Sequence, residues 1–277
     1  MSAGFLGGAT LLMSVYARDT ECLFRRALAS ALDTEDRLDQ AIVVVDGPLG
    51  AELERVLAVY ETRADVEILR IPQNVGLASA LNEGLARVKT EWVVRADADD
   101  LNVPERFAMQ ADFSRRYPNV SCFGGAIDEY AANGAAVARR TVPLLHEDIV
   151  RRARARNPFN HMTVAYRVDA VRAVGGYPNL YLREDYGLWA LLIRQGVLCA
   201  NLPQVLVHAS AGRELYRRRG GWRYAIGEWS LQKHLVRCGV APPLEAFFHG
   251  AIRFCVFALP PRVRGFVYES LLRGSPR

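Results

Sequence analysis

Cysteine is scarce in this 277-residue chain, and its spacing does not mark a cross-linked or zinc-binding protein. The cysteines lie at positions 22, 122, 199, 238 and 255, an odd number with no CxxC pair. Disulfide frameworks and structural zinc sites are normally recognised by paired cysteines at short spacings. We therefore expect reduced thiols in a cytosolic protein, and neither a disulfide-stapled secreted module nor a zinc module.

Long apolar runs are also missing, because no uninterrupted stretch reaches the ~18 residues of a membrane-spanning helix. Residues 1–16 are apolar, but they lack a basic start and a cleavage pattern. We interpret them as leading into a first strand and not as a signal peptide.

Glycine-rich phosphate loops are absent as well. Neither a P-loop nor a GxGxxG motif stands at an expected strand–helix junction. If a nucleotide binds, we expect a metal ion to neutralise its diphosphate. Residues 14–22 also lack the glycines that a nucleotidyltransferase usually carries near its N-terminus, which weakens that alternative.

The charge is modestly basic, +5 overall, but it is unevenly distributed. Basic clusters gather mostly in the second half, at Arg139-Arg140, Arg151 to Arg156, Arg213 to Arg223 and Arg262 to Arg264. This pattern favours anionic substrates or an anionic membrane surface. No nucleic-acid-binding motif accompanies it, so we do not expect a nucleic-acid partner.

Apolar runs alternate with helical periodicity through the first hundred residues. Strands are expected at 10–16, 41–47, 66–70 and 91–96, and helices at 20–32, 49–62 and 76–88. This alternation predicts βαβ units, and hence an α/β fold with a mostly parallel sheet flanked by helices.

The second half is less regular. Helices are expected at 103–117, 146–155 and 184–195, a hairpin at 120–130 and 136–141, and strands at 162–167, 197–201 and 205–209. The hairpin is indicated by Asn133-Gly134, a strong turn signal.

Three carboxylates follow the strand at 91–96, namely Asp97, Asp99 and Asp100. Ligands of open α/β sheets bind at the carboxyl ends of the strands, where Asp46 also closes a predicted strand. Crowded carboxylates repel each other, and Mg²⁺ or Mn²⁺ would offset that charge. The alternative is an acidic surface turn, with Asp100 only capping the next helix.

A calcium-binding loop does not fit these acids. An EF-hand loop starting at Asp97 would need an oxygen ligand at 101, glycine at 102 and glutamate at 108. The chain has Leu101, Asn102 and Ala108 there.

The C-terminal segment 244–274 interleaves phenylalanine with arginine on either side of Pro260-Pro261. This pattern is typical of an interfacial helix pair lying on a membrane. A C-terminal helix packed on the domain is an equally open alternative.

Several short motifs occur together in a recognisable order. They are Met13-Ser14-Val15-Tyr16, Val44-Val45-Asp46-Gly47, Asn74-Val75-Gly76-Leu77 with Leu81-Asn82, Arg95 to Asp100 with Pro104-Glu105-Arg106, Asn157-Pro158-Phe159-Asn160-His161, Gly175-Gly176-Tyr177, Glu184-Asp185-Tyr186 with Leu188-Trp189, and Arg218-Arg219-Gly220-Gly221. Over about residues 8–235 the chain resembles the family-2 glycosyltransferases of the GT-A fold. The resemblance is strongest to bacterial exopolysaccharide and capsule galactosyltransferases of the amylovoran-biosynthesis type.

The resemblance implies a role for each matching residue. Ser14, Tyr16 and Asp46 would hold the nucleoside, and Asn74 and Arg95 would position the nucleotide. Asp97 and Asp99 would form the DxD motif that carries the nucleotide-sugar and its Mn²⁺ or Mg²⁺. Asp185 would be the general base. His161, Glu184 and Trp189 would face the acceptor, whereas His208 departs from the usual pattern and leaves the acceptor side in doubt.

The implied function is inverting transfer of a sugar from a UDP-hexose, such as UDP-galactose, to a saccharide acceptor that is lipid-linked. The alternative within the family is a catalytically inactive assembly partner at the membrane. We expect a glycosyltransferase domain over 1–240, with a nucleotide half at about 8–118 and an acceptor half at about 119–240. An amphipathic tail over 241–277 would hold the protein peripherally on the inner face of the cell membrane.

Overall fold

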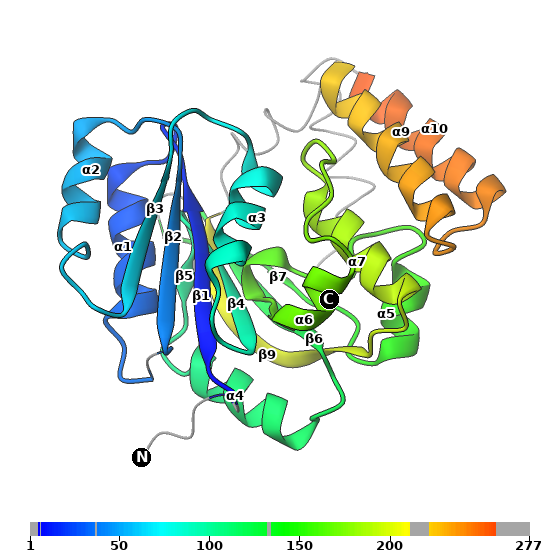
Figure 1. Ribbon diagram of the computed structural model, residues 1–277. Helices are drawn as coiled ribbons and strands as arrows, with labels where there is room; N and C mark the ends of the chain where they lie inside the picture. Colours follow the sequence, from blue (N-terminus) through cyan, green and yellow to red (C-terminus); the bar gives the residue numbers. More distant parts are fainter. Residues whose placement is uncertain (1–4, 6, 37, 132–133, 211–221, 259–277) are drawn as a thin grey trace.

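The computed structural model describes the chain except for residues 1–4, 6, 37, 132–133, 211–221 and 259–277 (Figure 1). Its strands are β1 (Ala9–Val15), β2 (Gln40–Asp46), β3 (Val66–Ile71), β4 (Trp92–Asp97), β5 (Leu101–Asn102), β6 (Cys122–Tyr130), β7 (Ala136–Arg140), β8 (Ala165–Arg167) and β9 (Cys199–Ser210). Its helices are α1 (Glu21–Leu32), α2 (Ala51–Ala58), α3 (Leu77–Arg87), α4 (Arg106–Arg116), α5 (His146–Arg152), η1 (His161–Thr163), α6 (Val168–Ala173), α7 (Glu184–Arg194), α9 (Trp222–Arg237) and α10 (Pro243–Ala258).

All of these strands belong to one sheet. Along it they follow the order β3-β2-β1-β4-β8-β6-β9-β5, with β7 paired to β6. The strands β1 to β4 are parallel where they pair, as are β6 and β9, while β8, β5 and β7 pair antiparallel. The mostly parallel sheet that was expected from the strand–helix alternation is therefore confirmed.

Two strand predictions differ from the structure. The strand expected at 162–167 is shorter, because His161–Thr163 form the 3-10 helix η1 and only Ala165–Arg167 form β8. The two strands expected at 197–201 and 205–209 are a single long strand, β9, which runs beside β6. Pro203 lies between the two predicted strands and lacks an N–H group for the hydrogen-bond ladder. The register with β6 is irregular at this point, between Gly124 and Ala126, and such irregularities accommodate proline within a strand.

Two hydrophobic cores lie on the two faces of the sheet. Alternate residues of β1 point to opposite sides, so Leu11 and Met13 join one core and Leu12 the other. The first core is closed by α1, α2 and α4, and the second by α3, α6 and α7 (Figure 1). Strands buried on both faces explain the continuous apolar runs in the sequence.

The helices α9 and α10 form a pair that packs on the outside of α7 (Figure 1). Leu231 and Leu235 of α9 and Ala246 of α10 are buried with Tyr186 and Ala190 of α7. The predicted tail therefore begins as a helix packed on the domain, while its second half, with Pro260-Pro261, lies outside the described residues. Within the described part of the chain, no helix combines the length and apolar character needed to cross a membrane.

Candidate active site

The carboxyl ends of β2, β1 and β4 lie side by side at one edge of the sheet (Figure 1). Ser14 of β1 is directly opposite Asp97 of β4, and Asp46 closes the neighbouring β2. Both pairings are parallel, so the predicted nucleotide residues of three strands meet at one edge, where α/β sheets bind their ligands.

Asp46 organises the loop that precedes α3. Its carboxylate accepts hydrogen bonds from Asn74 Nδ2 (2.9 Å) and from the backbone N–H groups of Val75 (2.7 Å) and Gly76 (3.0 Å). Gly47 follows with φ +86°, and a Cβ there would lie 2.7 Å from the backbone nitrogen of Asn74. Glycine therefore allows this loop to approach the end of β2. Asp46 is buried, while Asn74 is exposed at the rim.

Arg95 forms the floor beneath the DxD motif. It is 1% exposed, and its guanidinium donates to the carbonyl oxygen of Leu12 (3.1 Å) and to Asp97 Oδ1 (2.5 Å). Arg106 is completely buried behind it and donates to the carbonyl oxygen of Arg95 (2.7 Å). Burial lowers the pKa of Arg106 to about 9. Arginine thus supplies part of the positive charge that was expected beside the carboxylates. The sequence placed Arg106 in a recognised motif but assigned it no role.

Asp100 does not cap the next helix, so that alternative is wrong. The N-cap of α4 is Glu105, and Asp100 instead accepts a hydrogen bond from the backbone N–H of Ser210 (3.0 Å), at the end of β9. Burial, followed by the charges of Asp97 and Asp99, raises the pKa of Asp100 well above its ordinary value. Asp100 therefore joins the segment after β4 to the end of β9, and the more accessible acids of the motif are Asp97, which is partly exposed, and Asp99, which is exposed.

We call the strand edge that carries Asp97 and Asp99 the first wall of the site. The second wall is the group of residues around His161 of η1. His161 Nε2 lies 3.2 Å from the hydroxyl of Tyr177, and its ring centroid lies 6.0 Å from that of Trp189. Burial and the nearby Arg95 lower the pKa of His161 to about 4, so the imidazole is neutral at physiological pH. Trp189 is 1% exposed, so it supports the imidazole from behind instead of facing an acceptor directly.

Asp185 and Glu184 begin α7 on the same wall, but their environments differ. Asp185 is partly exposed, and Asn157 Nδ2 donates to its Oδ2 at 2.6 Å. Glu184 is buried, and burial together with the charge of Asp185 raises its pKa to about 7. The partnership of Asn157 with Asp185 was missed in the sequence, although Asn157 opens one of the recognised motifs.

The two walls face each other. The charges of Arg95 and Asp97 act on both His161 and Glu184, which places the two walls within electrostatic reach. Tyr16 is partly exposed just after β1, and its backbone N–H donates a hydrogen bond to the carboxylate of Asp19. His208 lies farther along β9, with its ring centroid 4.9 Å from that of Tyr130. The Arg218-to-Gly221 motif lies outside the described residues.

A divalent metal fits the donor set at the end of β4. Asp97 gives one oxygen to Arg95, and Asp99 is exposed beside it. Among the described residues, no group of three or more histidines, cysteines or acids is close enough to hold a metal ion. Mg²⁺ in proteins is usually bound by one or two carboxylates together with phosphates of the substrate. If a metal binds here, Asp97 and Asp99 would be the carboxylates that hold it.

Comparison with known families gives the decisive match. The model of the family described as "Glycosyl transferase family 2" matches residues 10–174, which is more than half of the chain. The chain belongs to glycosyl transferase family 2. The match includes the DxD edge and His161 but ends before Asp185. It favours glycosyl transfer over the nucleotidyltransferase alternative.

Full-length relatives agree with the resemblance seen in the sequence. The UDP-Gal:alpha-D-GlcNAc-diphosphoundecaprenol beta-1,3-galactosyltransferase of Escherichia coli is 32% identical, covering 95% of this chain and 96% of the relative. The amylovoran biosynthesis glycosyltransferase AmsE of Erwinia amylovora is 33% identical, covering 96% and 99%. This family-2 glycosyltransferase therefore matches both relatives along nearly their whole length.

A solved structure supports the fold. The mannosyltransferase PcManGT of Pyrobaculum calidifontis, in complex with GDP-Man and Mn²⁺, superimposes with a TM-score of 0.62. The superposition covers 97% of this chain and 76% of the mannosyltransferase chain, and the two sequences are 18% identical. At this identity the likeness concerns the fold, and the GT-A architecture is confirmed.

Proposed function

We propose that this family-2 glycosyltransferase transfers a hexose from a UDP-hexose such as UDP-galactose to a lipid-linked saccharide, with inversion at the anomeric carbon. The proposal rests on one juxtaposition: the acids at the end of β4 face the wall that holds Asp185. The activity for which the Escherichia coli relative is named supports the donor and the acceptor class.

On the donor side, Ser14, Tyr16 and Asp46 would bind the nucleoside. Asn74 and Arg95 would position the diphosphate. Asp97 and Asp99 would hold Mn²⁺ or Mg²⁺, which when bound offsets the negative charge that develops on the leaving diphosphate. Arg95 keeps Asp97 oriented through their ion pair (2.5 Å).

On the acceptor side, Asp185 would remove the proton from the attacking hydroxyl. A hydroxyl is a weak nucleophile while protonated, and a carboxylate within hydrogen-bond reach removes the proton as the new bond forms. Glu184 is less suited as the base because it is buried, whereas Asp185 is partly exposed and within reach of an acceptor hydroxyl. The neutral imidazole of His161 can exchange hydrogen bonds with acceptor hydroxyls without adding charge.

We further infer that α10 contacts an anionic membrane in which the lipid-linked acceptor lies. One face of α10 is packed, but Leu244, Phe247, Phe248 and Ile252 are between 55% and 69% exposed. Lys233 and Arg237 are exposed on the neighbouring α9. Such a combination of apolar and basic side chains suits the interface of an anionic bilayer.

The proposed activity is tested with purified full-length enzyme, Mn²⁺, a panel of nucleotide-sugars and a GlcNAc-diphospho-lipid acceptor. We expect transfer from a UDP-hexose, and NMR of the product should show a β-linkage from the α-linked donor. An α-linkage would contradict inversion. Failure to transfer from any nucleotide-sugar in the panel would support the inactive assembly partner instead.

A further inference from the structure

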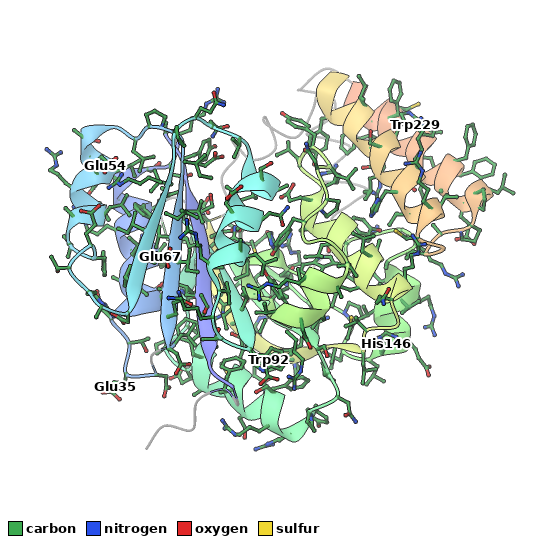
Figure 2. All side chains as sticks on the ribbon, viewed as in Figure 1. Glu35, Glu54, Glu67, Trp92, His146 and Trp229 are labelled. Atoms are coloured by element: carbon green, nitrogen blue, oxygen red, sulfur yellow. The ribbon has the colours of Figure 1, made fainter. Side chains whose placement is uncertain are left out.

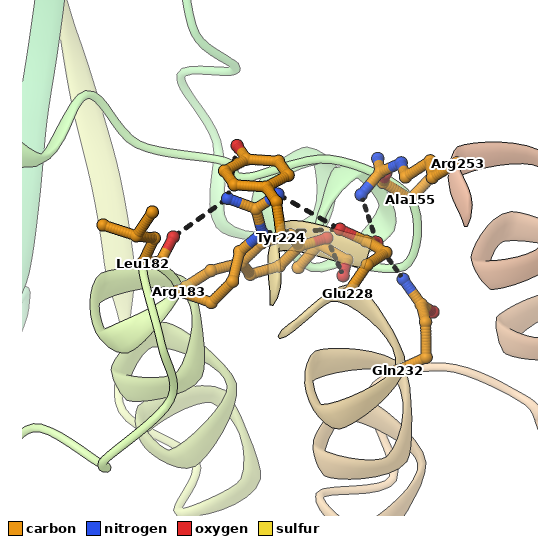
Figure 3. A network of polar contacts seen from close by, with 9 residues as sticks. Ala155, Leu182, Arg183, Tyr224, Glu228, Gln232 and Arg253 are labelled. Carbon is orange, nitrogen blue, oxygen red and sulfur yellow. Dashed lines mark hydrogen bonds and ion pairs between the residues drawn. The ribbon is translucent and has the colours of Figure 1, made fainter. Parts of the chain in front are cut away.

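A buried carboxylate connects the outer helix pair with the domain. Glu228 of α9 is fully buried, and its carboxylate accepts hydrogen bonds from Arg253 Nη1 (2.8 Å) and Gln232 Nε2 (2.8 Å). Arg183 Nη2 completes the cluster at 3.3 Å (Figure 3). Glu228 thus bridges two arginines that come from different parts of the chain.

Each of these arginines leads to one segment of the candidate active site. Arg183 is the N-cap of α7, so it stands two residues before Asp185. Arg253 of α10 donates to the backbone carbonyl of Ala155, two residues before Asn157. The Arg183–Glu228–Arg253 triad therefore joins the same two segments that the hydrogen bond between Asn157 and Asp185 joins.

The orientation of Asn157 is itself fixed. Its Oδ1 accepts a hydrogen bond from the backbone N–H of Phe159 (3.2 Å), so Nδ2 is the atom that faces Asp185. An amide N–H can only donate, so the carboxylate of Asp185 is the acceptor in this contact. Both segments must stay in place for this short contact to persist.

The segment before α7 also carries strained backbone. Leu182 has φ +53°, in the left-handed region that a branched side chain rarely adopts. Arg183 holds this turn by donating to the carbonyl oxygen of Leu182 (2.9 Å) and to the hydroxyl of Tyr224 (2.8 Å), with its guanidinium 4.3 Å from the Tyr224 ring centroid. Strain of this kind persists only where the surroundings hold it, and it gathers at functional sites.

Stability alone does not account for a buried triad. Burial by itself would raise the pKa of Glu228, but the facing Arg253 and Arg183 outweigh it and lower the pKa, so Glu228 is charged. Well-packed apolar residues often serve as well as a buried charge cluster. The triad adds a fixed geometry between the start of α7, α9 and α10, which carry Arg183, Glu228 and Arg253.

We propose that Glu228 is a positioning residue that, through Arg183 and Arg253, sets the distance between Asn157 and Asp185. The α9–α10 helix pair thereby takes part in shaping the reactive carboxylate. This inference rests on the proposed function, in which Asp185 is the base.

The test uses full-length Glu228→Gln, which keeps the size of the side chain but removes its charge. We expect kcat to fall about tenfold to a hundredfold while the donor KM changes less than about twofold, because only the base is displaced. Glu228→Asp should restore part of the loss. Glu54→Gln is the matched control, since Glu54 pairs with Arg70 at the surface on the far side of the molecule (Figure 2) and should leave kcat unchanged.

A double-mutant cycle separates positioning from simple stabilisation. In an Asp185→Asn background, Glu228→Gln should cause no further loss of kcat. The inference is overturned if Glu228→Gln only lowers the thermal midpoint and leaves kcat per UDP-binding site unchanged. It is also overturned if the effects of Glu228→Gln and Asp185→Asn on kcat are fully additive. If Glu228→Gln does not fold, Arg183→Lys, which keeps the charge but loses the planar donor pair, should show the same pattern. Wild-type transfer by Asp185→Asn alone would instead refute the proposed base, a separately visible failure.

Discussion

Single carboxylates of this enzyme have different tasks because their surroundings differ. Asp46 and Asp100 are buried and organise backbone, whereas Asp97 and Asp99 remain accessible at the end of β4. The sequence shows all four as acids near strand ends. Only the folded environment separates the acids that hold the site together from those available to a ligand.

The metal-binding role of the motif can be tested at Asp99. Asp99→Ala should lower UDP affinity in Mn²⁺ by at least about tenfold, or about 1.4 kcal/mol, because the ion between diphosphate and protein loses a ligand. Isothermal titration calorimetry in Mn²⁺ and in EDTA measures this. Asp148→Ala on α5 is the control, as it removes an acid that is 45% exposed. Wild-type UDP affinity that is equal in Mn²⁺ and EDTA would rule out the assignment.

Glu184 should make stability depend on pH. Its folded pKa is raised from 4.5 to about 7, so its contribution is complete below pH 4.5 and is lost as the pH rises to about 7. From pH 5 to pH 8, the wild type should therefore lose on the order of 2–3 kcal/mol of unfolding free energy relative to Glu184→Gln.

Urea unfolding of both proteins at the two pH values measures this difference. Glu83→Gln, at an exposed position of α3, is the control and should show no comparable pH effect. A gap between wild type and Glu184→Gln that does not change with pH would contradict the raised pKa.

Among the elements, the parallel strands were the most predictable. The runs at 10–16, 41–47 and 91–96 became β1, β2 and β4 because strands buried on both faces must be apolar throughout. The run at 66–70 became β3, a partly exposed strand at the edge of the sheet. The hairpin of β6 and β7 was also predicted, although Asn133 of its turn lies outside the described residues.

Other parts of the fold and site could not be foreseen. The short β5 and the continuity of β9 depend on pairing with distant strands. Asn157 and Asp185 are 28 residues apart, and Glu228 meets Arg183 across 45 residues. Local periodicity carries no information on which buried polar groups will meet, so these contacts require the structure.

The exposed apolar face of α10 allows the proposed membrane contact to be tested by mutation. Trp229 on α9 packs near Phe247, but Phe248 and Ile252 remain 55% and 64% exposed. Replacing both by serine should weaken binding to anionic vesicles by roughly one to two powers of ten, from the lost apolar burial.

Co-sedimentation with vesicles at low salt measures this partitioning. Val59→Ser provides the control, because Val59 is an exposed apolar residue beside α2. If the wild type does not sediment with anionic vesicles, α10 is not a membrane contact.

At the scale of the whole molecule, the proposed function assigns the donor and the acceptor to two neighbouring parts of the fold. The edge formed by β2, β1 and β4 would hold the donor and its metal, and the wall of η1 and α7 would hold the acceptor. The α9–α10 pair lies behind α7 and presents its apolar face outward. Under the proposed function, this arrangement would let a lipid-linked acceptor reach Asp185 while its lipid stays in the membrane. The division into a domain over 1–240 and a tail stays a prediction, although α10 packs directly on α9.

The most direct test of this account is the transfer rate of Asp185→Asn with saturating donor and acceptor. This substitution keeps the size of the side chain but removes the base. We predict a fall in kcat of roughly 10²–10⁴, with UDP-hexose affinity nearly unchanged because the donor contacts lie on the opposite wall. Near-wild-type transfer by Asp185→Asn would contradict the account.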